Sequence, residues 1–174
     1  MIISIMGYMG SGKSHISKLL SQKINFQLFE LDRCISEETG MEISEIFAQK
    51  GEIYFRKIEK KLLNHLIKQN TNAVLSLGGG TPAYYDNIDI INEFSESFFL
   101  SVSVKTLCER LWHERLHRPI ISRINHEDLP EFVSKHLFER NPFYAKAKHI
   151  IFTEGKSQED ICNEIIRLLN LQNL

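Results

Sequence analysis

The 174-residue chain contains few cysteines and no long hydrophobic segment, and each absence excludes a class of protein. Cys34, Cys108 and Cys162 lie far apart without a CxxC spacing, and their odd number argues against a disulfide framework. No apolar run approaches the roughly 18 residues that a membrane helix requires. The apolar N-terminus carries no basic leader before its glycine motif. We therefore expect a cytoplasmic protein without a membrane partner.

A strong excess of charge is also missing. The chain has 21 Lys and Arg against 22 Asp and Glu, for a net charge of −1. Such a protein has no overall field to attract nucleic acid, so we expect no nucleic-acid partner. The length suits one domain with one core, and we expect a monomer.

Short apolar segments alternate along the chain with segments of helical periodicity. This alternation predicts a parallel sheet covered by helices on both faces, in one three-layer α/β domain. The final helix is expected to begin near Ser157, because Asp160 three residues later completes a capping box. The predicted strands are 1–6, 27–31, 73–77, 98–102 and 150–153, and the predicted helices include 13–24, 52–68, 104–113 and 131–140.

A glycine-rich motif follows the first predicted strand. The segment 7–14, GYMGSGKS, matches GxxxxGK[ST] and lies between a strand and a helix, as a phosphate-binding P-loop must. Its backbone N–H groups and the following helix N-terminus attract phosphate oxygens. Lys13 is expected to reach the β- and γ-phosphates of ATP, and the Ser14 hydroxyl to ligate Mg²⁺. The motif predicts the nucleotide but not the reaction.

Acidic residues end the second predicted strand at Glu30-Leu31-Asp32. If this segment is a strand, Glu30 and Asp32 face the same side at its carboxyl end, where ligands gather in open α/β sheets. Asp32 is then a candidate to accept a hydrogen bond, or a proton, from a substrate hydroxyl. The alternative is that Asp32 only caps the following helix.

Several arginines and a glycine triplet are further candidates. Arg56 either forms surface pairs with Glu52 or Glu59 at helical spacing or binds a substrate carboxylate. The triplet 78–80 forms either a tight turn or a bare surface that a ligand can approach. Arg118 lies in a basic, histidine-rich segment, 113–126, expected to be a mobile loop, and Arg140 precedes Asn141-Pro142. Each arginine taken alone also fits a solvated surface charge.

One motif points to different chemistry. His113-Glu114-Arg115-Leu116-His117 matches HExxH, the zinc-protease signature, in which two histidines share a helix face. Arg118-Pro119 follows directly and is expected to end the helix. Only loosely spaced glutamates follow as a third ligand, so the zinc interpretation is the weaker one.

Taken in order, the motifs GYMGSGKS, FELD, EIYFRKIE, LSLGGG, HRPII and ERNPFY resemble shikimate kinase along nearly the whole chain. The resemblance implies a P-loop NTPase fold of the nucleoside-monophosphate-kinase type, with a five-stranded parallel sheet in the order 2-3-1-4-5. It also implies a single domain over 1–174, with a helical substrate-binding region at about 32–63 and a lid at about 113–126. The implied reaction is ATP-dependent phosphorylation of the 3-hydroxyl of shikimate.

The resemblance also implies roles for individual residues. Shikimate is expected to contact Asp32 through its hydroxyls, Arg56 and Arg140 through its carboxylate, and the backbone of Gly79. Arg110 is expected to stack on adenine, and Arg118 to contact the ATP phosphates. Lys13, Asp32 and Arg118 are the expected catalytic residues, with Ser14 on Mg²⁺. The ATP-binding residues implied in the P-loop are Gly10, Ser11, Gly12, Lys13, Ser14 and His15.

Four departures from the family pattern and two alternatives accompany this assignment. Glu30 stands where the family usually has Asp, His15 where it usually has Thr, and the lid ends RPII in place of RPLL. In the segment 151–157, neither the acidic residue nor the proline of the family's adenine loop stands in the expected place. The chain is alternatively a kinase for gluconate or a nucleoside monophosphate. A nucleotide-binding regulatory module without turnover is the alternative outside enzymes.

Overall fold

The computed structural model describes residues 1–69, 71–114 and 121–171, and five strands of this part form one parallel sheet. The strand order is β2-β3-β1-β4-β5, which confirms the predicted fold and order. Central strand β1 pairs with β3 through Ile3 and Val74 and with β4 through Ile3 and Glu96. The strands are β1 (Ile2–Met6), β2 (Gln27–Glu30), β3 (Ala73–Ser76), β4 (Glu96–Ser101) and β5 (His149–Phe152).

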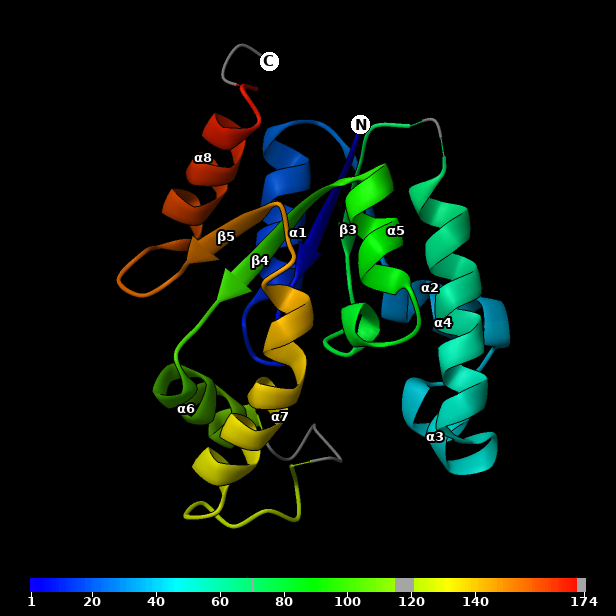
Figure 1. Cartoon of the computed structure of the whole chain (residues 1–174), viewed down its shortest axis with the longest axis vertical. Coiled ribbons are helices and arrows are strands. Elements are labelled where there is room, and N and C mark those ends of the chain that lie inside the picture. The colour runs from blue at the N-terminus through cyan, green and yellow to red at the C-terminus, as the bar shows by residue number, and fades with distance from the viewer. Residues whose placement is uncertain (70, 115–120, 172–174) are drawn as a thin grey trace.

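Helices cover both faces of this sheet (Figure 1). Alternate residues of β1 serve opposite faces, as strand geometry requires. Ile3 and Ile5 pack in a cluster with α1 and α8, whereas Ile2 and Met6 belong to a larger cluster formed with the remaining helices. The helical elements are α1 (Lys13–Lys23), α2 (Leu31–Thr39), α3 (Ile43–Gln49), α4 (Gly51–Ile67), the 3-10 turn η1 (Thr81–Ala83), α5 (Asn87–Phe94), α6 (Val104–Glu114), α7 (Leu129–Tyr144) and α8 (Gln158–Leu168).

The carboxyl ends of the strands point away from both chain termini, toward α3 and α6 (Figure 1). The connections after β1, β2 and β3 therefore meet at one edge of the sheet. These connections hold the P-loop, Asp32 and the glycine triplet, so the topology gathers the predicted motifs.

The structure differs from the sequence expectations at two boundaries. Strand β2 ends at Glu30, and Leu31 begins α2, because Leu31 and Ile35 are one helical turn apart and both fully buried in the larger cluster. Helix α7 continues past the expected end through Pro142 to Tyr144, whose side chain is also fully buried. The predicted capping box at the start of α8 is confirmed, since Ser157 and Asp160 bond each other's backbone N–H.

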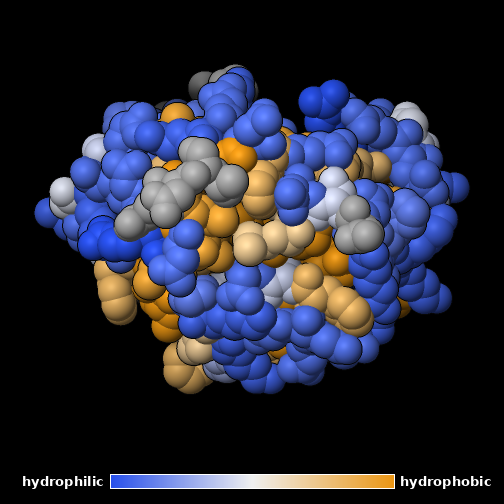
Figure 2. All heavy atoms as spheres, turned by 90° about the horizontal axis from the view of Figure 1, so that it is seen from above, coloured by the Kyte–Doolittle hydropathy of each residue, from blue (hydrophilic) through white to orange (hydrophobic). Residues whose placement is uncertain are grey.

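One face of the molecule combines polar and apolar residues. Figure 2, seen from above Figure 1, shows a hydrophilic rim around hydrophobic residues in the middle of that face. Within the described residues, no helix combines the length and apolarity needed to cross a membrane.

Candidate active site

The P-loop connects β1 to α1 through a backbone that turns twice into the left-handed region. Gly10 has φ +79° and Gly12 has φ +91°, conformations that L side chains rarely adopt. A Cβ on Gly10 would also lie 3.1 Å from Leu111 Cδ2. Lys13 begins α1, and its Nζ donates to the carbonyl of Tyr8 at 2.9 Å, so the lysine folds back along the loop. The loop thus presents backbone N–H groups, a helix N-terminus and an ammonium group together.

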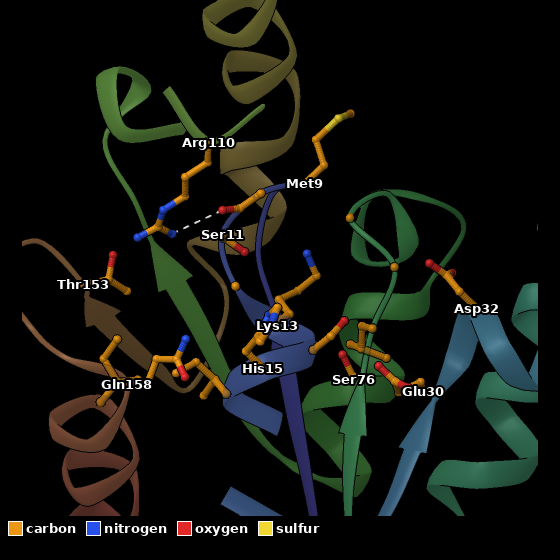
Figure 3. Close-up of a pocket in the computed structure, with 18 of the residues that line it drawn as sticks. Met9, Ser11, Lys13, His15, Glu30, Asp32, Ser76, Arg110, Thr153 and Gln158 are labelled. Carbon is orange, nitrogen blue, oxygen red and sulfur yellow. Dashed lines mark hydrogen bonds between the residues drawn. The ribbon is translucent and has the colours of Figure 1, made fainter. Parts of the chain in front are cut away.

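A cavity of about 700 Å³ surrounds this loop. Figure 3 shows Lys13 in its middle, with Glu30, Asp32 and Ser76 on one side and Thr153 and Gln158 on the other. The cavity is therefore one continuous space with the P-loop between two differently built halves. Of the predicted site residues, its lining includes Gly10, Ser11, Gly12, Lys13, Ser14, His15, Asp32, Gly79 and Arg110.

Asp32 reaches the cavity from a helix and not from a strand. It lies in the first turn of α2, where a carboxylate also suits the helix dipole, and no side-chain cap is formed there. Although Asp32 is open to the cavity, the protein around it desolvates the carboxylate and raises its pKa, against the opposing charges of Lys13 and Arg56. Glu30 and Asp32 both line the cavity. The prediction that both lie on one strand is wrong, because Glu30 ends β2 and Asp32 lies in α2.

Arg56 lies outside the cavity lining, in a buried network between α4 and η1. Arg56 is 9% exposed, so the expected alternative, an ion pair at the surface, is wrong about where this arginine lies. Both expected pairs nevertheless form, with Glu52 at 3.3 Å and with Glu59 at 2.8 Å. Glu59 also accepts a 2.6 Å hydrogen bond from Thr81, and its burial raises its pKa despite Arg56. Sequence reasoning named Glu59 as a partner of Arg56 but did not predict its burial or its bond to Thr81.

The glycine triplet 78–80 lies between the P-loop, Asp32 and Arg56. A Cβ on Gly79 would lie 3.4 Å from the Met9 backbone N, and one on Gly78 would lie 3.0 Å from Asp32 Oδ1. A Cβ on Gly80 would lie 2.8 Å from Arg56 Nη2. Without side chains, the triplet therefore lets the P-loop, Asp32 and Arg56 converge on one short segment.

Arg140 approaches from α7 on the far side of the P-loop. Its guanidinium carbon lies 5.7 Å from the centre of the Tyr8 ring, and its Nη1 is buried without a hydrogen-bond partner among the described residues. One turn later, Tyr144 donates its hydroxyl to the carbonyl of Gly79. Tyr144 was not predicted as a site residue, although it belongs to the ERNPFY motif. The extension of α7 through Pro142 places Arg140 and Tyr144 on one helix face.

The other half of the cavity is more open. Arg110 Nη1 donates to the Gly10 carbonyl at 3.2 Å, and Figure 3 shows its side chain reaching toward the loop. Thr153, Lys156 and Gln158 complete this half. His113 and Glu114 end α6 in exposed positions, whereas Arg115, His117 and Arg118 lie outside the described residues. The described residues contain no group of three His, Cys, Asp or Glu side chains that could hold a metal ion.

A family model described as Shikimate kinase matches residues 9–170. The chain belongs to the shikimate kinase family. Curated shikimate kinases are similar to it over nearly their full length. The one from Flavobacterium psychrophilum is 40% identical over 168 residues, covering 96% of this chain and 98% of the relative. The one from Flavobacterium johnsoniae is 38% identical with the same coverage.

Solved structures agree with this family assignment. A shikimate kinase from Bacteroides thetaiotaomicron is similar with a TM-score of 0.88 and 33% identity, covering 99% of this chain and 98% of that chain. A shikimate kinase from Acinetobacter baumannii in complex with shikimate has a TM-score of 0.87 and 26% identity, covering 99% and 94%. A deoxyadenosine kinase from M. mycoides with bound dATP shares only the fold, at 20% identity, a TM-score of 0.60 and coverage of 98% and 100%.

Proposed function

We propose that this chain transfers the γ-phosphoryl group of ATP to the 3-hydroxyl of shikimate, giving shikimate 3-phosphate and ADP. The observation that carries the proposal is the cavity in which a P-loop meets Asp32 and the glycine triplet, with Arg56 directly behind the triplet. A phosphate site beside a carboxylate and a guanidinium group suits an acceptor that carries both hydroxyls and a carboxylate.

The ATP phosphates lie along the P-loop in this proposal. The backbone from Gly10 to Ser14 binds the phosphate oxygens, and Lys13 stabilises the negative charge that spreads over the transferred group. Lys13 Nζ donates to the Tyr8 carbonyl within the loop, and in this proposal it turns toward a phosphate when ATP binds. The predicted role of Arg118 stays a prediction, since this residue lies outside the described part of the chain.

The acceptor lies between the P-loop and α4. Asp32 accepts a hydrogen bond from the attacking hydroxyl, orients it toward the γ-phosphorus and receives its proton as the new P–O bond forms and the bond to ADP breaks. The backbone at Gly79 contacts the ring, and the carboxylate pairs with Arg56 and Arg140. The buried Nη1 of Arg140, without a partner among the described residues, supports this assignment, because a substrate carboxylate satisfies such a donor.

The residues present also suit Mg²⁺. The Ser14 hydroxyl and the carboxylates of Glu30 and Asp32 line the same cavity, and oxygen ligands of this kind are those that Mg²⁺ prefers. Ser14 would be its direct ligand, and Glu30 would hold a water bound to it. The ion would supply positive charge that offsets the charge of the phosphates.

The proposal also covers organisation. The chain acts as one domain over 1–174, as a monomer in the cytoplasm, without nucleic acid or membrane. The net charge of −1 supports the absence of a nucleic-acid partner. The region 32–63 corresponds to α2, α3 and most of α4, and its proposed role is to hold the acceptor. Light scattering after size exclusion tests the oligomeric state.

ADP release in the presence and absence of shikimate tests the function. We expect release to depend on shikimate and on Mg²⁺, with equimolar shikimate 3-phosphate. Gluconate and nucleoside monophosphates serve as matched acceptors, and ADP release with either of them in place of shikimate contradicts the proposal. ATP binding without turnover on any acceptor favours a regulatory module.

A further inference from the structure

The guanidinium group of Arg56 is held on several sides before any substrate arrives. Its Nε and Nη2 both lie 3.3 Å from Glu52 Oε1, and its Nη1 lies 2.8 Å from Glu59 Oε2. A guanidinium group has five N–H donors, two of them on each Nη. These contacts therefore leave one N–H on Nη1 and one on Nη2 for a substrate carboxylate.

Tyr84 contacts this arrangement twice. Its ring centre lies 3.8 Å from Arg56 Cζ, a close cation–π contact. Its hydroxyl donates to Glu52 Oε1 at 2.6 Å, and this is the oxygen that accepts from Nε and Nη2 of Arg56. Tyr84 thus holds the guanidinium group both directly and through Glu52.

The two glutamates that bind Arg56 differ in what fixes them. Glu59 is 1% exposed and is anchored from inside by Thr81. Glu52 is exposed, and its contacts with Arg56 are long. The hydrogen bond from Tyr84 is the shortest contact that Glu52 makes among the described residues, and it is the main cause that lowers the pKa of Glu52. Tyr84 therefore holds Glu52 in place on the solvent side of Arg56.

We propose that Tyr84 is a positioning residue for the acceptor. Together with Glu52 it orients Arg56 so that the two remaining donors face the substrate carboxylate. This inference rests on the proposed role of Arg56. The position of Tyr84 supports it, because Tyr84 directly follows η1 and thereby links α4 to the segment after the glycine triplet. Tyr84 acts only through Arg56 and Glu52 and does not touch the reacting atoms.

Steady-state kinetics of Tyr84→Leu and Tyr84→Phe test the proposal. We expect Tyr84→Leu to raise the KM for shikimate about 10-fold, since it loses both contacts, and Tyr84→Phe about 3-fold, since it keeps the ring. The KM for ATP and kcat should change less than about twofold in both. Equal rises in the two KM values, or no rise for shikimate, overturn the proposal.

The neighbouring Tyr85 provides a matched control. Tyr85 is 53% exposed, and its ring centre lies 5.1 Å from Lys60 Nζ. Tyr85→Leu should leave all kinetic constants unchanged. If it raises the KM for shikimate as much as Tyr84→Leu does, the effect belongs to the loop and not to the contact with Arg56. Thermal unfolding of each variant shows whether the fold is intact, and Tyr84→Phe, the smaller change, still tests the proposal if Tyr84→Leu does not fold.

A double mutant separates this inference from the proposed function. In an Arg56→Ala background, Tyr84→Leu should cause no further rise in the KM for shikimate, because the residue through which it acts is gone. Additive effects overturn the positioning role alone. If Arg56→Ala by itself leaves the KM for shikimate unchanged, the carboxylate role fails instead. Shikimyl alcohol, which lacks the carboxylate, should bind wild type and Tyr84→Leu equally.

Discussion

The cavity has an acceptor half, on the side of Glu30 and Asp32, and a half for the nucleotide base (the base half), on the side of Thr153 and Gln158 (Figure 3), and the two are supported differently. Behind the acceptor half, Arg56 pairs with Glu52 and Glu59, which accept hydrogen bonds from Tyr84 and Thr81 respectively. In the base half, Lys156 and Gln158 are exposed, and Lys156 pairs with Glu164 outside the cavity lining. The first half is a connected network, and the second is a set of separate side chains.

This difference indicates which ligand, the acceptor or the nucleotide base, the site selects more strictly. Groups fixed before binding lose little conformational entropy when a ligand arrives, so they bind selectively those ligands that match their geometry. Burying Arg56 and Glu59 is costly, and their mutual hydrogen bond offsets only part of that cost. We infer that the benefit of this pair is a fixed orientation of the Arg56 guanidinium group beside the substrate cavity. We therefore expect strict selection of the acceptor and looser selection of the base.

The largest loss of activity is expected from a change at Lys13, which lies between the two halves of the cavity (Figure 3). Lys13→Ala removes the ammonium group that stabilises charge on the transferred phosphoryl group, and kcat should fall about 1,000-fold. Binding of shikimate, measured by calorimetry without nucleotide, should persist, because the proposed carboxylate site is built on Arg56, which is held by Glu52 and Glu59. Near-normal turnover in this variant rules out the proposed phosphate clamp.

Next in size is the loss of Arg56 from the acceptor half. Arg56→Ala should raise the KM for shikimate about 100-fold, the usual scale for removing one partner of a buried charge pair. The KM for ATP should change little, because Arg56 lies behind the glycine triplet, against Gly80, and not at the P-loop. Since Glu59 is left without its partner, thermal unfolding serves as the control for folding. Loss of ATP binding in a folded variant contradicts the carboxylate role.

A smaller effect, in pH dependence, is expected from Asp32. Desolvation raises its pKa above that of an exposed aspartate. The carboxylate is the active form in our proposal, so kcat/KM for shikimate should fall about tenfold per pH unit as pH drops below this raised pKa. The fall should therefore begin at a higher pH than an ordinary aspartate would give. Asp32→Asn should have low activity without this acid limb, and a limb that persists in Asp32→Asn assigns it to another group.

Much of the fold was predictable because its determinants are local. The P-loop motif, the strand–helix alternation and the Ser157 capping box each depend on a few neighbouring residues, and each is found where expected. The start of α2 at Leu31 was missed because burial in the tertiary core, and not the local pattern, decides it. The same reason applies to the continuation of α7 through Pro142.

The acceptor network was less accessible to sequence reasoning. Spacing on one helix indicated that Arg56 pairs with Glu52 or Glu59, but not that both pairs form and are anchored from another segment. The partners Thr81 and Tyr84 lie 22 and 32 residues from the glutamates that they contact. No local pattern encodes such contacts, because they depend on how α4 packs beside η1.

A change in the base half should give the smallest loss of activity. This prediction tests most directly whether the two halves differ in selectivity. Gln158 is exposed at the start of α8, and its carboxamide offers both a donor and an acceptor to a purine edge. Gln158→Ala should lower kcat/KM for ATP only about twofold and leave the KM for shikimate unchanged, because a neutral hydrogen bond in water contributes little. GTP should also replace ATP with kcat/KM within about tenfold, because one carboxamide can turn to match either base. If Gln158→Ala or the change to GTP lowers kcat/KM as much as Arg56→Ala does, the base half is as selective as the acceptor half, and the contrast drawn from their contacts is wrong.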